Sequence, residues 1–362
     1  MQIFSADKIF TGKEWLLNHA VVVENNRVKE IIPVTAATET VTAFGNAFIA
    51  PAFIDLQIYG AGKKLFAVYT EKDALAKLVA YCRSGGAAYC MPTIATLPYQ
   101  AFYKCIDAVR DYWNSGGGGV LGLHIEGPWI SAAKRGAHVE ACIHSPTMEQ
   151  VKQLLQYGKD VIKIITLAPE VCSQQIIDTI LSYGIVISAG HSNATYEAAT
   201  HAFDNGITTA THLYNAMSPL QHRSPGVVGA ILDHNKVMSS IIPDGQHVDF
   251  AAVRIAKQIM KKRLFVITDA VTETTEGYYP HQFAGDKYES NGILSGSALT
   301  MNKAVKNLVT QCGIELTEAL QMCSLYPAQV MKMENEYGVL QPGAVAAMLV
   351  MNDKFEVLSM IN

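Results

Sequence analysis

Eight runs of apolar and β-branched residues recur along the sequence and alternate with segments of helical periodicity. The runs lie near residues 47–57, 87–95, 119–127, 161–169, 185–191, 208–212, 237–245 and 264–270. Runs of this length closed by turn residues predict strands that are buried on both faces of a parallel sheet. The stretches between them, such as MEQVKQLLQYGKD and CSQQIIDTILSYG, carry apolar residues at helical spacing. The chain is therefore predicted to fold as an α/β protein with a (β/α)8 TIM-like barrel.

The two ends of the chain show a different pattern. Residues 1–50 and 338–362 contain short alternating strands separated by turns such as ENNR, QPG and NDK. We predict that both ends join in one small β-sandwich domain and that residues 51–337 form the barrel.

Composition and charge exclude several classes of protein. The chain has 362 residues, of which 49% are hydrophobic, and this is enough for a large core. A net charge of −4 without long blocks of like charge indicates no nucleic-acid partner. The N-terminus lacks a signal-peptide pattern, and no apolar stretch approaches the roughly 20 residues needed to span a bilayer. The seven cysteines form no CxxC pair. We expect reduced thiols and a cytoplasmic protein without membrane contact.

Four predicted strands end in residues that can bind a metal or move a proton. Glu126 closes GLHIEG, His191 closes IVISAGH, His212 closes TTATH and Asp269 closes LFVITD. Because the carboxyl ends of barrel strands share one face, we expect these side chains to converge. Glu, His and His match a catalytic zinc site with three protein ligands and an open position. The pattern therefore favours a metal-dependent hydrolase.

Each of these residues also has a structural interpretation. The Glu126 carboxylate could belong to a buried salt bridge. His191 and His212 could cap helices or form hydrogen bonds in the core, and Asp269 could cap a turn. His124 lies on the same side of its strand as Glu126 and could compete as a ligand. The hydrolase hypothesis rests on the set, because no single member supplies a complete metal site.

Seven motifs resemble, in order and spacing, the N-acetylglucosamine-6-phosphate deacetylase family of the amidohydrolase superfamily. They are GLHIEGPW, AGHSNAT, THLYNAM, RSPGVVGAILD, PDGQHVD, VITDA and LSGSALTM. The likeness covers nearly the whole chain, including the two β-rich ends. It implies hydrolysis of N-acetyl-D-glucosamine 6-phosphate to D-glucosamine 6-phosphate and acetate, in amino-sugar catabolism.

The resemblance also implies roles for individual residues. Glu126, His191 and His212 would hold one divalent metal ion. Zn²⁺ matches this ligand set best, although such a site also accepts Fe²⁺, Mn²⁺ or Co²⁺. Asp269 would act as general base and then as general acid. His138, which follows Glu126 by twelve residues, would polarise the substrate.

The same resemblance implies a set of substrate contacts. They are Ala137, His138, Asn215, Ala216, Arg223 and His247. The forked guanidinium of Arg223 suits a phosphate, although a solvated surface charge is the structural alternative. His138 and His247 could equally be exposed loop histidines. In the resembled family the phosphate site lies near a dimer interface. A homodimer or a tetramer is therefore implied, and one phosphate contact could come from a neighbouring subunit.

One departure from the wider superfamily bears on the number of metal ions. Gln57 and Tyr59 occupy the places of a His-x-His pair that helps many amidohydrolases to hold a second metal. Neither side chain is a good zinc ligand, so we predict a mononuclear site.

The sequence is also compatible with two alternative functions. A related amidohydrolase acting on another N-acyl amino sugar, a cyclic amide or an N-acyl amino acid would not need Arg223 and His247. A non-catalytic barrel that binds sugar phosphate as a sensor would not need the metal ligands together with Asp269.

Overall fold

The computed structural model describes residues 1–290 and 292–361, and the chain divides into two compact units. One unit comprises Met1–Asp55, Cys82–Tyr89 and Thr300–Asn362, and the other comprises Leu56–Tyr81 and Cys90–Leu299. The division expected from the sequence, with residues 1–50 and 338–362 in one domain and 51–337 in the other, stays a prediction.

A sheet of eight parallel strands holds the residues of the site. Its strands are β6 (Phe53–Ile58), β9 (Ala87–Ile94), β10 (Leu123–Glu126), β11 (Ile162–Leu167), β12 (Val186–Ala189), β13 (Thr209–Ala210), β14 (Met238–Ile241) and β15 (Leu264–Val266). They neighbour one another in chain order from β6 to β15. A parallel bridge between Ile58 and Ala270 joins the two ends of the sheet, where the Tyr59 amide donates to the Ala270 carbonyl at 2.9 Å. The predicted barrel is confirmed.

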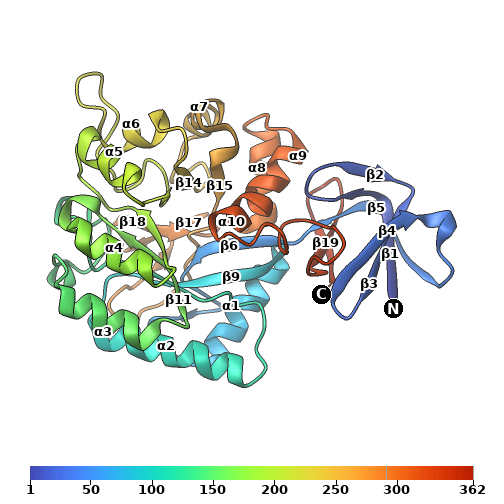
Figure 1. Cartoon of the computed structure of the whole chain (residues 1–362), viewed down its shortest axis with the longest axis horizontal. Coiled ribbons are helices and arrows are strands. Elements are labelled where there is room, and N and C mark those ends of the chain that lie inside the picture. Colours follow the sequence, from blue (N-terminus) through green and yellow to red (C-terminus); the bar gives the residue numbers. More distant parts are fainter. Residues whose placement is uncertain (291, 362) are drawn as a thin grey trace. The chain divides into compact units, whose positions relative to one another are not determined.

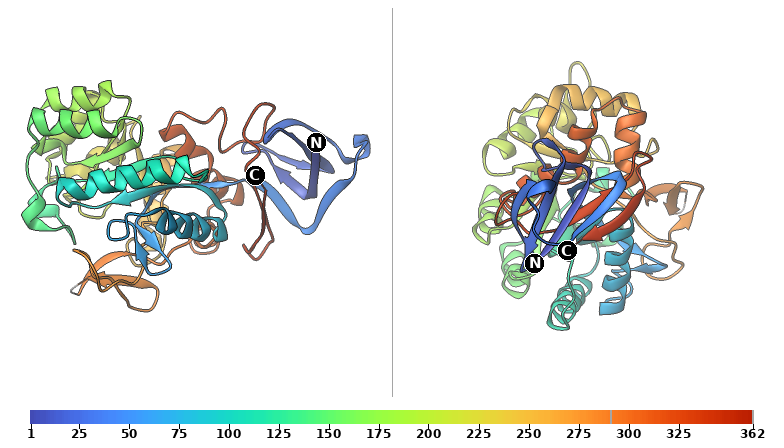
Figure 2. Two further views of the ribbon diagram at one scale, coloured as in Figure 1. Left: turned by 90° about the horizontal axis from the view of Figure 1, so that it is seen from below. Right: turned by 90° about the vertical axis from the view of Figure 1, so that its right-hand side faces the viewer.

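Helices occupy the segments between these strands, and α2 to α5 lie outside them (Figure 1, Figure 2). The helices are α1 (Lys72–Ser84), α2 (Tyr99–Asn114), α3 (Met148–Gly158), α4 (Gln174–Ser182), α5 (Tyr196–Asp204), α6 (Gly226–Asp233) and α7 (Phe250–Met260). Their starting points follow from capping chemistry. Thr147 and Gln150 form a reciprocal capping box at the start of α3, and Ser173 and Thr195 cap α4 and α5. Each cap satisfies amides that would otherwise lack partners.

The first predicted strand divides between two sheets. Residues up to Pro51 belong to β5 (Val41–Pro51), which pairs with strands from both chain ends, whereas β6 enters the barrel. The sequence could not show this division, because residues 47–58 are buried throughout. Hydrophobic periodicity carries no signal where both halves of a run are equally apolar.

The two ends of the chain share one seven-stranded sheet. Its strands are β1 (Gln2–Phe10), β2 (Trp15–Leu17), β3 (His19–Glu24), β4 (Arg27–Pro33), β5, β19 (Met348–Met351) and β20 (Val357–Ile361). β19 pairs antiparallel with β5 and so joins the C-terminal strands to the N-terminal ones. The expected β-rich domain built from both termini is confirmed.

The remaining elements are short. Helices α8 (Met301–Thr310), α9 (Leu316–Cys323) and α10 (Leu325–Val330) precede the last two strands. A small hairpin joins β7 (Gly60–Ala61) and β8 (Lys64–Leu65), and a three-stranded sheet joins β16 (Gln282–Phe283), β17 (Lys287–Ser290) and β18 (Ile293–Ser297). Within the described ranges, no helix has the length and hydrophobicity to cross a membrane.

Candidate active site

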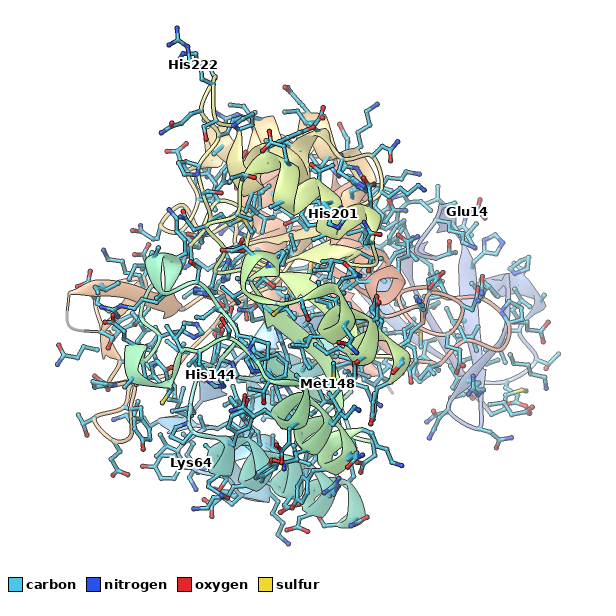
Figure 3. All side chains as sticks on the ribbon, turned by 60° about the vertical axis from the view of Figure 1, so that its left-hand side comes forward. Glu14, Lys64, His144, Met148, His201 and His222 are labelled. Atoms are coloured by element: carbon cyan, nitrogen blue, oxygen red, sulfur yellow. The ribbon has the colours of Figure 1, made fainter. Side chains whose placement is uncertain are left out.

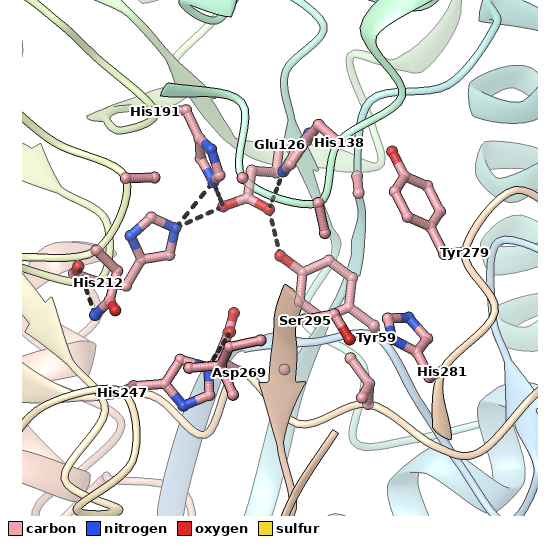
Figure 4. Close-up of a pocket in the computed structure, with 18 of the residues that line it drawn as sticks. Tyr59, Glu126, His138, His191, His212, His247, Asp269, Tyr279, His281 and Ser295 are labelled. Carbon is pink, nitrogen blue, oxygen red and sulfur yellow. Dashed lines mark hydrogen bonds and ion pairs between the residues drawn. The ribbon is translucent and has the colours of Figure 1, made fainter. Parts of the chain in front are cut away.

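Three of the predicted site residues turn sharply out of the barrel strands. His191, His212 and Asp269 follow β12, β13 and β15 with φ angles of 48°, 39° and 53°. The left-handed region is uncommon for residues other than glycine and costs free energy. Each turn places its side chain at the carboxyl end of the barrel, where Figure 4 shows them around one pocket. The strained backbone conformations therefore occur where these three side chains meet.

Glu126, His191 and His212 form a compact cluster of potential metal ligands. The Oε1 atom of Glu126 lies 3.3 Å from Nε2 of His191 and 3.1 Å from Nε2 of His212. The two histidine Nε2 atoms are 3.1 Å apart. All three side chains are buried. Among the described residues, this is the one group of three or more potential ligands within reach of a single ion.

The spacing of these three atoms fits a single metal ion. For metal–ligand bonds of about 2.0–2.1 Å, the edge of a tetrahedron is about 3.3 Å, close to the three separations in the cluster. His191 Nδ1 lies 2.9 Å from the Lys134 carbonyl oxygen, which only accepts, so Nδ1 carries the proton. In a neutral imidazole this leaves the lone pair on Nε2, and a second partner of this kind is usual for metal-bound histidine.

The second oxygen of Glu126 faces two hydrogen-bond donors. The Tyr59 hydroxyl donates to Oε2, and His138 Nε2 lies 3.3 Å from the same atom. Burial raises the pKa of Glu126, but its electrostatic interaction with His191 and the hydrogen bonds of the surrounding histidines outweigh it and hold that pKa well below its usual value. Burial, with the charges of the nearby carboxylates, raises the pKa of Tyr59. Glu126 is therefore an ionised ligand, and Tyr59 keeps its proton.

Gln57 links the two carboxylates of the site. Its amide nitrogen donates to Asp269 Oδ1 at 2.7 Å and lies 3.1 Å from Glu126 Oε1. The Asp269 backbone amide in turn donates to the Gln57 carbonyl at 3.0 Å. A neutral amide thus connects the two acidic groups of the site. Asp269 is held on Oδ1, and its Oδ2 lies 4.0 Å from His247 Nε2.

His138 is fixed in one tautomer by its own loop contacts. The Thr96 backbone amide donates to His138 Nδ1 at 3.2 Å, so Nδ1 has no proton and Nε2 carries it. Burial lowers the pKa of His138 to about 4, which keeps the ring neutral at pH 7. His138 therefore presents one N–H beside the metal-ligand cluster.

His247 is oriented by a carboxylate that the sequence reasoning missed. Asp244 accepts hydrogen bonds from the amides of Gln246 and His247 at 2.9 and 2.8 Å, and its Oδ2 lies 2.6 Å from His247 Nδ1. Burial raises the pKa of Asp244, but its hydrogen bond with His247 outweighs this effect and the pKa is lowered. Nε2 of His247 therefore points toward Asp269 and the pocket. The motif DGQH, which places Asp244 three residues before His247, is the sequence signal that could have predicted this contact.

A cavity of about 210 Å³ connects these groups. Nine of the ten residues assigned a metal, catalytic or substrate role from the sequence line it, namely Glu126, Ala137, His138, His191, His212, Asn215, Ala216, His247 and Asp269. Arg223 is not among its lining residues and is exposed. Figure 3 shows its neighbour His222 at the tip of a projecting loop. Among the described residues no Lys or Arg lines the cavity.

Three further lining residues were given no role from the sequence, although Ser295 lies within the LSGSALTM motif. Tyr279, His281 and Ser295 belong to the segment after the last barrel strand and reach the same cavity (Figure 4). No periodic pattern marks this segment. His124, which could have competed as a ligand, is engaged elsewhere, because its two ring nitrogens contact the Leu56 carbonyl at 3.1 Å and the Thr166 hydroxyl at 2.7 Å.

The family of the chain follows from comparison with known proteins. The model of the Amidohydrolase family matches residues 48–361, and the NagA composite domain matches residues 5–44. Because the first match spans most of the chain, the protein belongs to the amidohydrolase family. This family implies a divalent metal ion, in agreement with the Glu126, His191 and His212 cluster.

Within that family, the chain is similar to a narrower group of enzymes. It is 34% identical to N-acetylglucosamine-6-phosphate deacetylase of Haemophilus influenzae, over 98% of this chain and 96% of that protein. The crystal structure of the Pasteurella multocida enzyme of the same name matches with a TM-score of 0.94 and 34% identity, covering 99% of this chain and 97% of that one. The structure of a mutant N-acetyl-D-glucosamine-6-phosphate deacetylase from Mycobacterium smegmatis, in complex with N-acetyl-D-glucosamine-6-phosphate, matches with a TM-score of 0.92 and 26% identity. This match covers 100% of this chain and 97% of that one.

Proposed function

We propose that this protein hydrolyses N-acetyl-D-glucosamine 6-phosphate to D-glucosamine 6-phosphate and acetate. The observation that carries the proposal is one pocket that joins a Glu–His–His cluster to a buried aspartate. Relatives that match over nearly the whole chain carry this activity in their names. Hydrolysis of an acetamide needs an activated water, a sink for negative charge on the carbonyl oxygen and a proton for the departing amine.

Glu126, His191 and His212 would hold one divalent ion, with zinc as the best match to two imidazoles and a carboxylate. Such an ion supplies a Lewis acid for the acetamide carbonyl and lowers the pKa of water to about 7. Gln57 and Tyr59 support a single ion, because both donate hydrogen bonds to Glu126.

Asp269 would move the proton. It would take a proton from the attacking water as the oxygen bonds to the carbonyl carbon, and then deliver it to the nitrogen as the C–N bond breaks. Its Oδ1 accepts a hydrogen bond from Gln57, its Oδ2 faces His247, and the residue lines the pocket. The Nε2 proton of His138 would stabilise the developing charge on the carbonyl oxygen.

The sugar phosphate would be held by other residues that line the same pocket. Ala137, Asn215, Ala216 and His247 line the pocket and would contact the sugar phosphate, but no cation lines it within the described part of the chain. We propose that Arg223 of the partner subunit completes the phosphate site in a homodimer, because Arg223 lies on an exposed loop of its own chain. A tetramer built from two such dimers would contain the same pairing of subunits.

Mixed dimers test this assignment. Arg223→Ala and Asp269→Asn should each be impaired at low substrate concentration, and mixing them should restore about a quarter of wild-type activity, because half of random dimers would carry one intact site. If Arg223 served its own chain, mixing would restore no activity.

We further propose a cytoplasmic location, since the seven cysteines are all free thiols.

Acetate release and metal content test the overall proposal. Purified protein should contain close to one divalent ion per chain and release equal amounts of acetate and glucosamine 6-phosphate. Chelation should abolish turnover, and zinc should restore it. His212→Ala should lose the ion, whereas the control His144→Ala, which removes a histidine that does not line the pocket, should keep it. Full activity in a metal-free protein would contradict the mechanism.

A further inference from the structure

We propose that Glu170 is a positioning residue, which holds the turn after His191 and, through Ser192, the loop that carries Asn215 and Ala216. This inference rests on the proposed deacetylase function and deepens it, because the turn carries a metal ligand and the loop lines the substrate pocket. Glu170 itself is not among the lining residues, so it would act through the residues that it holds.

Glu170 lies at the carboxyl end of β11, in a single turn of 3-10 helix at Pro169–Val171. The two strands that pair with β11 are β10, which ends at Glu126, and β12, which leads to His191. None of the residues assigned a role from the sequence lies between β11 and β12. Because active sites of such barrels form at the carboxyl ends of the strands, Glu170 is placed to support its neighbours there.

Both oxygens of the Glu170 carboxylate bind the residues that follow His191. Oε2 accepts a hydrogen bond from the Ser192 hydroxyl at 2.6 Å, and Oε1 accepts one from the Asn193 backbone amide at 2.6 Å. The Ser192 oxygen also accepts from the Ala194 amide at 3.2 Å. A carboxylate that accepts two hydrogen bonds from adjacent residues restrains the orientation of the turn as well as its distance.

Ser192 connects this turn to the loop after His212. Its backbone amide donates to the Ala216 carbonyl at 3.1 Å, and its carbonyl accepts from the Ser218 amide at 3.0 Å. Ser192 is fully buried, so its hydroxyl needs the acceptor that Glu170 provides. A displacement of Ser192 would therefore reach the metal ligand on one side and the substrate loop on the other.

The backbone at both ends of this connection is strained. His191 has a φ angle of 48° and Ala216 one of 49°. Residues other than glycine keep such conformations only where the surrounding structure fixes them. The His191 carbonyl accepts from the Ser131 amide at 2.9 Å, and its Nδ1 lies 2.9 Å from the Lys134 carbonyl oxygen. These bonds hold His191 itself, and Glu170 holds the two residues that follow.

The first test measures metal binding and needs no substrate. Zinc-loaded wild type and Glu170→Ala compete with a chromogenic chelator, which gives the dissociation constant for zinc. We expect binding to weaken about tenfold in Glu170→Ala, as when a residue that orients a metal ligand is lost. Glu197→Ala removes an exposed carboxylate from the first turn of α5 and should bind zinc as wild type does. Equal zinc affinity in Glu170→Ala and wild type would overturn the positioning role.

A second variant shows whether Glu170 acts through Ser192. Ser192→Ala removes one of the two hydrogen bonds and leaves the Asn193 amide on Glu170, so zinc binding should weaken less than in Glu170→Ala. The double variant should be no weaker than Glu170→Ala, because the two residues share one interaction. Additive losses would contradict the coupling. Ser192→Ala also replaces Glu170→Ala if that protein does not fold.

The second test separates positioning from stability. With zinc at a saturating concentration, Glu170→Ala should raise KM for N-acetylglucosamine 6-phosphate about tenfold and lower kcat less than about threefold. The difference is expected because Asp269 and His138 are held by Gln57 and Thr96.

Three results would overturn parts of this account. A Glu170→Ala protein with a lower melting temperature but unchanged KM and zinc affinity would show a structural role alone and overturn the proposal. The same unchanged values in an active wild-type background would leave the proposed function standing. A wild type that binds zinc and releases no acetate from the sugar would overturn the proposed function and the positioning role with it.

Discussion

Replacing Asp269 by asparagine removes the group proposed to transfer the proton and keeps the shape of the side chain. Gln57 donates to Oδ1 of Asp269 at 2.7 Å, and an asparagine oxygen can accept the same hydrogen bond. The changed atom is Oδ2, which faces His247 Nε2 at 4.0 Å. We therefore expect the free energy of unfolding to change by no more than about 1 kcal/mol.

Turnover should fall far more than stability. An amide cannot take the proton from water and return it to the amine, and a positioned acid–base group contributes about 10²–10⁴-fold to the rate. We expect kcat for acetate release to drop by this factor, equivalent to about 3–5 kcal/mol in the activation barrier. The metal content should stay at the wild-type value, because Asp269 is not in the ligand cluster.

A charge-matched control makes the result specific. Asp249 caps α7 through its side chain and is exposed, and Asp249→Asn removes the same charge while keeping a capping oxygen. That variant should keep wild-type kcat. An Asp269→Asn protein that folds, holds its metal and retains a tenth or more of wild-type turnover would refute the assigned role.

Three further predictions concern other parts of the molecule. Arg223→Ala should lower kcat/KM for phosphorylated substrate about tenfold to a hundredfold and leave unphosphorylated N-acetylglucosamine unchanged; equal losses in steady-state kinetics would count against a phosphate contact. The pKa of His281 is lowered from 6.5 to about 4, so its contribution to stability is fully present above about pH 6.5 and is lost as the pH falls toward 4. In urea unfolding across that range, the free energy of unfolding of wild type should fall by about 3 kcal/mol more than that of His281→Phe. Parallel pH profiles for the two proteins would exclude this effect. Thr147→Ala should cost about 1 kcal/mol in urea unfolding, since it breaks the capping box of α3; an unchanged midpoint would show that the cap is dispensable.

The barrel and the strand-end residues could be predicted because two simple rules coincide. Buried parallel strands appear as uninterrupted apolar runs, and the carboxyl ends of such strands meet at one face. Glu126, His191, His212 and Asp269 each follow such a run, so their convergence did not depend on any loop. The positive φ angles at three of these residues were not predictable, since neither histidine nor aspartate signals a left-handed turn reliably.

The rest of the pocket depends on contacts between distant segments. His281 and Ser295 meet through the pairing of short strands, and the bond from Ser297 to Asp269 brings that sheet to the site. No local pattern encodes such a pairing. For Gln57, the residue type indicated a poor zinc ligand, but only the structure shows its amide between Glu126 and Asp269.

The central claim is that this site deacetylates an amino-sugar phosphate. The most direct measurement is kcat/KM for acetate release from N-acetylglucosamine 6-phosphate and from N-acetylglucosamine, with protein that carries one metal ion per chain. The account predicts efficient release from the phosphorylated sugar and a preference for it of at least roughly tenfold, the contribution of one charge-assisted contact. No release from the phosphorylated sugar, or a preference for the unphosphorylated one, would contradict the account.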